Sequence, residues 1–275
     1  PDNVIGNSSL YGNVITGNDG NGVSISGANA SGNLLAGNYI GVSLSGDSSL
    51  GNDKNGVLIS NGAHDNIIGT SVDDGRNVIS GNAWSGVEID GSATQNNTVA
   101  YNYIGVDKDG NMPLGNQAQG VLIDDAENNT IGSATLYEGN VISANTLNGV
   151  YLSGAAGNVV IGNYIGVDAT GFGSLPNSAN GVSVSNGATN NVIGGDTDGE
   201  RNVISGNTGD GVSIFSSGTD DNTISGNYIG LDAGGVNTLA NGEDGVWIGG
   251  LASGNVIGGA TAGERNVISG NTWNG

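Results

Sequence analysis

The hexapeptide Asn-Val-Ile-Ser-Gly-Asn occurs three times in this chain, at residues 77–82, 202–207 and 266–271. Near copies at 13–18 and 140–145 bring the spacing between neighbours to about 63 residues. Between these copies lies a second motif, Asn-Tyr-Ile-Gly, at 38–41, 102–105, 163–166 and 227–230. Repetition at such a period indicates a solenoid, in which each repeat packs only on its neighbours.

A third motif, Gly-Val-x-Ile or a close variant, indicates that the structural unit is shorter than the period of about 63 residues. Successive copies begin 29 to 34 residues apart, at residues 22, 56, 86, 120, 149, 181, 211 and 245. The unit is therefore a coil of about 32 residues, and two kinds of coil alternate to make the longer period.

Each motif is too short for a helix and alternates apolar with polar residues, which is typical of a short strand. In the copy at 22–25, Val23 and Ile25 would point inward and Ser24 outward. Asn and Gly flank every copy, as tight corners require. We therefore predict an all-β fold: a parallel β-helix solenoid of about eight coils, with three short strands per coil, each pairing with its equivalent ~4.8 Å away.

The inward positions of the Gly-Val-x-Ile strands define the expected core, which includes Val23, Ile25, Val57, Ile59, Val87, Ile89, Val121 and Ile123. Residues 1–275 are expected to form a single β-helix domain. The chain starts and stops partway round a coil, so we expect an internal fragment of a longer repeat protein. We expect the strand edges at its ends to associate with flanking repeats or with other copies of the same chain.

Asparagine recurs at fixed corners, where its side-chain amide can bond the amide of the asparagine one coil away and hold the register. The predicted ladder residues are Asn18, Asn38, Asn82, Asn102, Asn145, Asn163, Asn207 and Asn227.

The charge balance excludes several partners. Five basic residues stand against 26 acidic ones, for a formal net charge of −21. Nucleic acid needs clusters of Lys and Arg, which this chain lacks. No apolar stretch approaches the ~20 residues of a membrane span, so we expect no membrane insertion.

These motifs resemble the right-handed parallel β-helix repeat proteins of the pectate-lyase-like superfold. The closest resemblance is to the arrays of NYIGxD and NVISGN repeats in large bacterial secreted and surface proteins. It covers essentially the whole chain and implies right-handed coiling and an extracellular or cell-surface location. It does not identify a function, because this scaffold carries lyases, hydrolases, epimerases and adhesins.

We find no catalytic constellation in the sequence. Pectate-lyase chemistry needs a basic residue beside calcium-binding carboxylates, but Arg76, Arg201 and Arg265 share one repeat position, which is typical of a structural role. The polygalacturonase motifs GHG and RxK are absent, although Asp124 and Asp125 form an acidic pair. The single histidine, His64, is expected on a surface loop. The sequence therefore favours a protein that is not an enzyme.

Two weaker features remain. Asp107 and Asp109 form a DxDGN run resembling the start of a calcium loop, and the alternative is a turn in which Asp caps its own backbone. No cofactor is required, and calcium is the one candidate.

The second feature is an outward stripe of alternating Tyr and Val, for which we considered a ligand-binding surface, with carbohydrate as the candidate ligand, and a surface covered by loops. Its tyrosines are Tyr39, Tyr103, Tyr164 and Tyr228, and the loop residues expected to cover it are Leu50, Leu114, Leu175 and Leu239.

Our leading functional prediction is a non-enzymatic structural or adhesive segment of an extracellular bacterial protein, which could form filaments. The alternative is a polysaccharide-binding or polysaccharide-degrading β-helix. A single groove that breaks the repeat symmetry and gathers Asp, Lys and Arg would favour an enzyme, and a smooth rod would favour the structural role.

Overall fold

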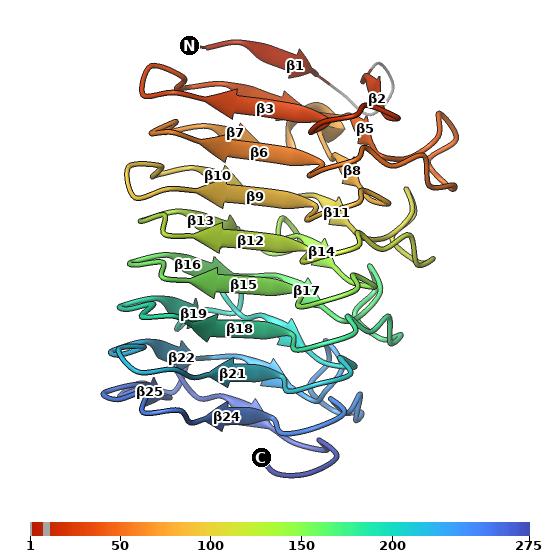
Figure 1. Cartoon of the computed structure of the whole chain (residues 1–275). Helices are drawn as coiled ribbons and strands as arrows, with labels where there is room; N and C mark the ends of the chain where they lie inside the picture. Colours follow the sequence, from red (N-terminus) through yellow and green to blue (C-terminus); the bar gives the residue numbers. More distant parts are fainter. Residues whose placement is uncertain (1, 8–11) are drawn as a thin grey trace.

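A computed structural model describes residues 2–7 and 12–275, which form a right-handed parallel β-helix, as expected (Figure 1). The three strands of each coil belong to three sheets, here named A, B and C, with nine, nine and eight strands. Every pairing is parallel and joins a strand to its equivalent in the adjacent coil.

The strands are short, and their order repeats along the chain. Sheet A contains β1 (Val4–Gly6), β4 (Leu34–Ala36), β7 (Ile67–Ile68), β10 (Thr98–Val99), β13 (Thr130–Gly132), β16 (Val159–Ile161), β19 (Val192–Gly194), β22 (Thr223–Ser225) and β25 (Val256–Ile257). Sheet B contains β2 (Val14–Ile15), β5 (Tyr39–Ile40), β8 (Val78–Ile79), β11 (Tyr103–Ile104), β14 (Val141–Ile142), β17 (Tyr164–Ile165), β20 (Val203–Ile204), β23 (Tyr228–Ile229) and β26 (Val267–Ile268). Sheet C contains β3 (Val23–Ser26), β6 (Val57–Ser60), β9 (Val87–Asp90), β12 (Val121–Asp124), β15 (Val150–Ser153), β18 (Val182–Ser185), β21 (Val212–Ile214) and β24 (Val246–Ile248).

The core is the column of inward side chains enclosed by the three sheets. The predicted core residues of the first four Gly-Val-x-Ile strands are all buried, in register from coil to coil, as Val87 with Val121 and Ile89 with Ile123. Ser24 points outward and is exposed, as expected. Ser213 occupies the same outward position but is only 2% exposed, so an outward residue of sheet C is not always a solvent-exposed one.

Asparagine ladders run along the corners, as predicted. The predicted residues divide between two ladders, one at the corner between sheets A and B and one between sheets B and C. In the first, Asn102 Nδ2 donates to Asn140 Oδ1 at 3.0 Å and to the carbonyl oxygen of Ile68 at 2.7 Å. In the second, Asn82 Nδ2 donates to Asn116 Oδ1 at 3.0 Å. These bonds satisfy buried corner carbonyls that the short strands leave unpaired.

A third ladder, which the sequence analysis did not single out, precedes sheet A. It includes the 2.9 Å bond from Asn66 Nδ2 to Asn97 Oδ1. A mixed column precedes sheet C, where aspartate replaces asparagine in two adjacent coils. There the backbone N–H of Asp244 donates to Asp210 Oδ1 at 3.1 Å, and Asn274 Nδ2 donates to Asp244 Oδ1 at 2.7 Å.

The described part of the chain contains one helical segment, the 3₁₀ turn η1 (Val72–Asp74). Within that part, no helix has the length and apolar character needed to cross a membrane. At either end of the solenoid, the terminal strands of each sheet pair on one side only.

Candidate functional site: a groove on sheet B

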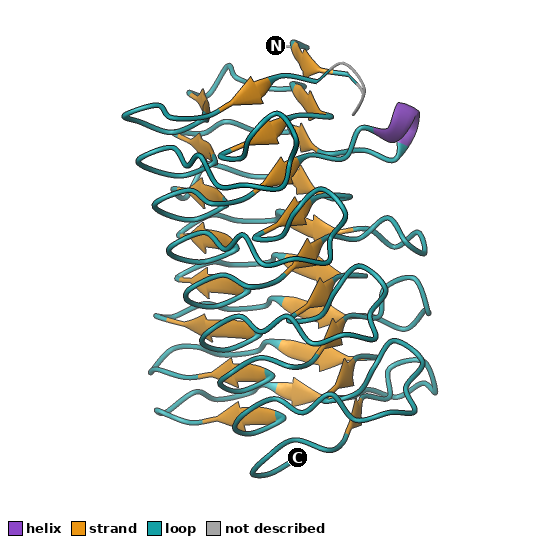
Figure 2. Ribbon diagram, turned by 90° about the vertical axis from the view of Figure 1, so that its right-hand side faces the viewer, coloured by secondary structure: helices purple, strands orange, loops and turns teal. Residues whose placement is uncertain are grey.

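Two rows of loops project beside sheet B (Figure 2). One row follows each Asn-Tyr-Ile-Gly motif, at 42–50, 106–114, 167–175 and 231–239. The other precedes the Asn-Val-Ile strands, at 70–76, 133–139, 195–201 and 259–265. Residues of both rows and of sheet B line one cavity of about 420 Å³, which is within the usual size of a small-ligand site.

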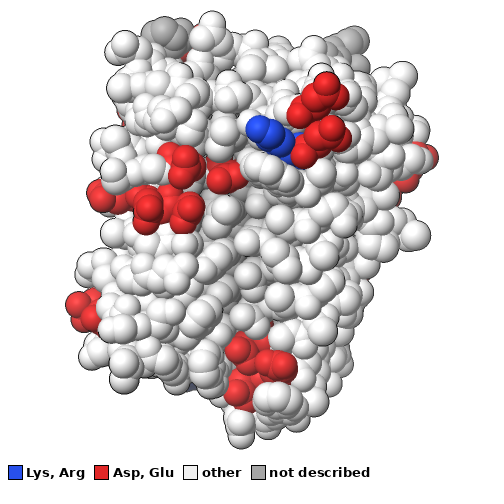
Figure 3. Space-filling model, viewed as in Figure 1, with Lys and Arg blue, Asp and Glu red and all other residues white. Residues whose placement is uncertain are grey.

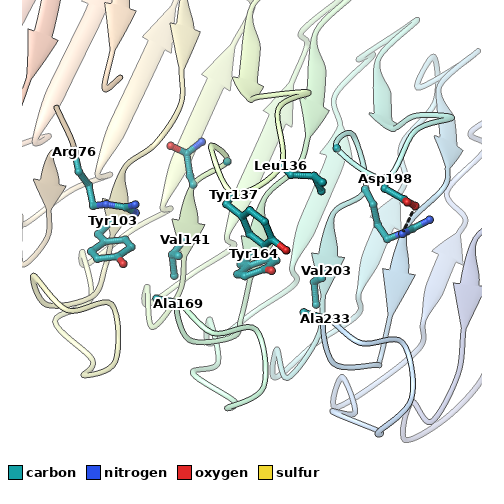
Figure 4. A pocket seen from close by; sticks show the side chains of 15 residues that line it. Arg76, Tyr103, Leu136, Tyr137, Val141, Tyr164, Ala169, Asp198, Val203 and Ala233 are labelled. Atoms are coloured by element: carbon teal, nitrogen blue, oxygen red, sulfur yellow. Dashed lines mark ion pairs between the residues drawn. The ribbon is translucent and has the colours of Figure 1, made fainter. Parts of the chain in front are cut away.

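The floor of this groove is the predicted stripe of alternating tyrosine and valine. Tyr103 pairs in register with Val78 and Val141, and Tyr164 pairs with Val141 and Val203. All four tyrosines of the stripe are half-buried. Tyr103 and Tyr164 line the groove (Figure 4).

The loops that follow the Asn-Tyr-Ile-Gly motifs cover part of the tyrosine rings, and a glycine of the loop makes the close contact. A methyl group placed on Gly110 would lie 2.8 Å from Cζ of Tyr103, and one on Gly171 would lie 3.1 Å from Cε2 of Tyr164. The predicted covering residue Leu50 is 52% exposed, and Leu114, Leu175 and Leu239 are half-buried. The stripe is therefore neither fully exposed nor fully covered. Its ligand-binding role remains a prediction.

Arginine side chains lie against the tyrosines. The guanidinium carbon of Arg76 is 3.8 Å from the ring centre of Tyr101 and 4.1 Å from that of Tyr103. Arg201 lies 4.4 Å from the ring centre of Tyr228 and forms an ion pair of 2.7 Å with Asp198. Arg76 and Arg201 thus have the structural role expected from their repeat position, and both also line the groove.

The arginine row beside sheet B is interrupted over the groove. Arg76, Arg201 and Arg265 precede the Asn-Val-Ile strand in three coils, whereas two coils carry glycine there, Gly12 in the first and Gly139 between Arg76 and Arg201. A side chain at Gly139 would collide with the backbone carbonyl of Gly162, since a Cβ atom would lie 1.7 Å from that oxygen.

The same loop supplies two apolar side chains, Leu136 and Tyr137, at positions where the loop at 195–201 has Asp198 and Gly199. Both line the groove, and both are largely exposed. The result is a gap in the arginine row, flanked by arginine at either end and lined by aromatic rings.

Burial changes the pKa of two floor tyrosines, Tyr103 and Tyr164. It raises the pKa of the Tyr103 phenol, although the Arg76 guanidinium acts in the opposite direction. Burial also raises the pKa of Tyr164, with a further contribution from Tyr137. A tyrosine phenol is protonated at neutral pH even at its ordinary pKa of about 10, and the upward shifts act in the same direction, so both phenols can donate hydrogen bonds.

The two aspartates of the predicted calcium loop have other contacts. Asp107 Oδ1 accepts hydrogen bonds from the backbone N–H groups of Asn111 at 2.8 Å and Met112 at 3.0 Å, which is the turn-capping arrangement. Asp109 pairs with Lys108 at 2.7 Å. Across residues 2–7 and 12–275, no three His, Asp or Glu side chains gather in a way that could hold a metal ion. Calcium binding remains a prediction here.

The acidic pair Asp124 and Asp125 lies at the end of a sheet C strand, with Asp124 in register with Asp90. Burial, followed by the charge of Asp124, raises the pKa of Asp90. Figure 3 shows the acidic side chains of this face gathered in a few separate groups. Neither Asp124 nor Asp125 lines the groove, and His64 pairs with its neighbour Asp65 at 2.7 Å.

The residues missed by the sequence analysis are Leu136, Tyr137 and Tyr101. The available signal was an aromatic residue at a repeat position that holds glycine in other coils, as with Tyr101 against Gly37, Gly162 and Gly226.

No protein-family model matches this chain, and no protein of curated function does. Several solved structures match it, including two epimerases. The A-module of the Azotobacter vinelandii mannuronan C-5 epimerase AlgE6 aligns with 94% of this chain at 19% identity and a TM-score of 0.53. The periplasmic alginate epimerase AlgG aligns with 82% at 14% identity and a TM-score of 0.50.

The present chain spans 56% and 58% of those two structures. At this level of identity the likeness extends to the fold, which is a parallel β-helix in each case.

Proposed function

We propose that this protein binds a polysaccharide, with the sugar chain lying in the groove on sheet B and running along the solenoid axis. The observation that carries the proposal is the cavity lined by Leu136, Tyr137 and Tyr164. It lies where Gly139 interrupts the arginine row between Arg76 and Arg201. Gly12 is a second glycine at the same repeat position.

The chemistry of the groove suits sugars. Aromatic rings offer flat apolar faces with a polar edge, as a pyranose ring requires. The protonated phenols of Tyr103 and Tyr164 can donate hydrogen bonds to sugar oxygens. Arg76 and Arg201 lie four coils apart, or ~19 Å at ~4.8 Å per coil, so an extended chain can span them. They also provide positive charge in a chain with only five basic residues.

The names of the two similar structures describe enzymes that act on mannuronan or alginate, which are polysaccharides. This supports the polysaccharide alternative over a purely structural role. Binding to a polysaccharide would also be one form of the adhesive function expected from the sequence. One of the two is named as periplasmic, which supports a location outside the cytoplasm for this chain as well.

Affinity electrophoresis in gels containing alginate, polygalacturonate or a neutral glucan tests the proposal. The wild-type protein is expected to be retarded by at least one of the three. The double variant Tyr103→Ala/Tyr164→Ala should lose that retardation, whereas Tyr151→Ala, a half-buried tyrosine on sheet C, should keep it. Retardation of all three proteins to the same extent, or of none in any gel, would rule out the groove as a polysaccharide site.

A further inference from the structure

Tyr137 has a backbone conformation that is unfavourable for its side chain. It lies in a turn closed by a 3.1 Å hydrogen bond from the N–H of Glu138 to the carbonyl oxygen of Thr135, and its φ angle is +67°. Positive φ favours glycine, and among other residues mainly Asn and Asp tolerate it. At the same position in the other loops of this row, Asp74 also has a positive φ of 54°, whereas Gly199 and Gly263 do not have a positive φ.

Packing within the protein does not offset this strain. The side chain of Tyr137 is 82% exposed, so it contributes little through burial. Strained residues that their own contacts do not stabilise concentrate at functional sites. The ring of Tyr137 lines the groove together with Tyr164 (Figure 4).

A second tyrosine repeats the pattern. Tyr101 has a φ angle of +57°, at a corner where Gly37, Gly162 and Gly226 have positive φ angles of 72°, 67° and 71°. Its backbone N–H donates to the carbonyl oxygen of Glu138 at 2.9 Å, which ties this corner to the loop that carries Tyr137.

Its ring also meets the Arg76 guanidinium, which lies against Tyr103 on the floor of the groove. The two replacements of glycine by tyrosine are thus parts of one local structure.

On the basis of the proposed polysaccharide binding, we propose that Tyr137 is a specificity-determining residue of the groove. Its ring contacts one sugar of the bound chain over Tyr164. Tyr101 is a positioning residue: it orients Arg76 and Tyr103 through the stack and supports the Tyr137 loop through the backbone bond. Both residues therefore act on the part of the groove between Arg76 and Tyr164.

The test compares Tyr137→Gly with Tyr137→Phe by isothermal titration with whichever polysaccharide retards the wild type, together with thermal unfolding. Tyr137→Gly should weaken binding about tenfold or more, which corresponds to about 1.4 kcal/mol. Its Tm should be unchanged, because glycine relieves the strain at positive φ and adds a similar entropic cost. Tyr137→Phe should retain most of the affinity, since it keeps the ring.

Tyr101→Gly and Tyr101→Phe test the positioning role in the same way, with Tyr151→Ala as the control off the groove. Tyr101→Gly is expected to weaken binding about tenfold, and Tyr101→Phe should bind with nearly the wild-type affinity. Wild-type binding that Tyr137→Gly leaves intact would overturn the inference while the proposed function stood. A wild type that binds none of the polysaccharides would overturn both.

Discussion

The guanidinium carbon of Arg76 lies 3.8 Å from the ring centre of Tyr101, a residue of the following coil at a corner that elsewhere belongs to glycine. Because Tyr103 approaches the same guanidinium to 4.1 Å, the arginine joins two rings at one end of the groove. Stacking occupies the faces of the planar guanidinium and leaves its N–H groups at the edge.

Arg76→Lys should lower the free energy of unfolding by about 1 kcal/mol, because lysine keeps the charge but cannot stack as a planar group on two rings. Chemical denaturation measures this, with Lys108→Arg on an exposed loop as the matched exchange. If Arg76→Lys proves as stable as the wild type, the stack contributes nothing to the fold.

Asn102→Ala should destabilise the protein by about 3 kcal/mol. The amide of Asn102 accepts a 2.9 Å bond from Asn77 and donates to Asn140, to Ile68 and to Ala100, so its removal leaves several buried polar groups unpaired. Asn111→Ala, at an exposed loop position, is the control. Equal unfolding curves for the two variants would show that the ladder does not stabilise the solenoid.

Asp210→Asn should raise stability at pH 7 by about 1 kcal/mol, because it replaces an ionised ladder residue by a neutral one that can bond in the same way. Burial raises the pKa of Asp210; the hydrogen bond from the backbone N–H of Asp244 lowers it, and the charge of Asp244 raises it. The folded state therefore holds this proton more tightly than the unfolded state. The stability that protonation provides is complete below the ordinary Asp pKa, about 4, and is lost as pH rises through the raised value.

Thermal melts between pH 3 and pH 8 should accordingly show the gain from Asp210→Asn growing with pH above about 4. Asp53→Asn, at an exposed position, should show no such trend. A stability gain from Asp210→Asn that is absent at pH 7, or that grows as pH falls, would contradict a raised pKa for Asp210 in the folded state.

Asp107→Ala should cost about 1–2 kcal/mol of stability, and Asp107→Asn much less, because Asn keeps an oxygen for the N–H groups of Asn111 and Met112. Because these bonds engage Asp107 Oδ1 and Lys108 engages Asp109 Oδ2, we expect millimolar calcium to leave the wild-type Tm unchanged. A rise in Tm with calcium that Asp107→Asn abolishes would instead establish the calcium site.

The repeat motifs predicted the fold because each of them acts locally. The alternation of apolar and polar residues determines which side chains face inward, as with Val87 and Ile89. An asparagine at a corner bonds to its equivalent one coil away, whatever the conformation of the loops. Register followed from the repeat itself, so the alternating column of tyrosine and valine was predicted residue by residue and confirmed.

The groove could not be predicted in the same way, because it depends on contacts between loops of different coils. The conformation of the loop at 133–139 involves the approach of Gly139 to the Gly162 carbonyl and of Glu138 to Tyr101. Both contacts recur in other coils, as Glu200 with Gly162 and Gly12 with Gly37, so they do not distinguish this loop in the sequence. The residues that depart from the repeat, Tyr101 and Tyr137, were visible as substitutions, but their side-chain directions were not.

The most direct test of polysaccharide binding is hydrogen–deuterium exchange of the wild-type protein with and without alginate oligosaccharides. If the groove binds the oligosaccharide, backbone amides at 135–141 and 162–166, which border the groove, should exchange more slowly, and those at 120–125 on sheet C should not change. No slowing at any site, or slowing confined to sheet C, would contradict binding in the groove.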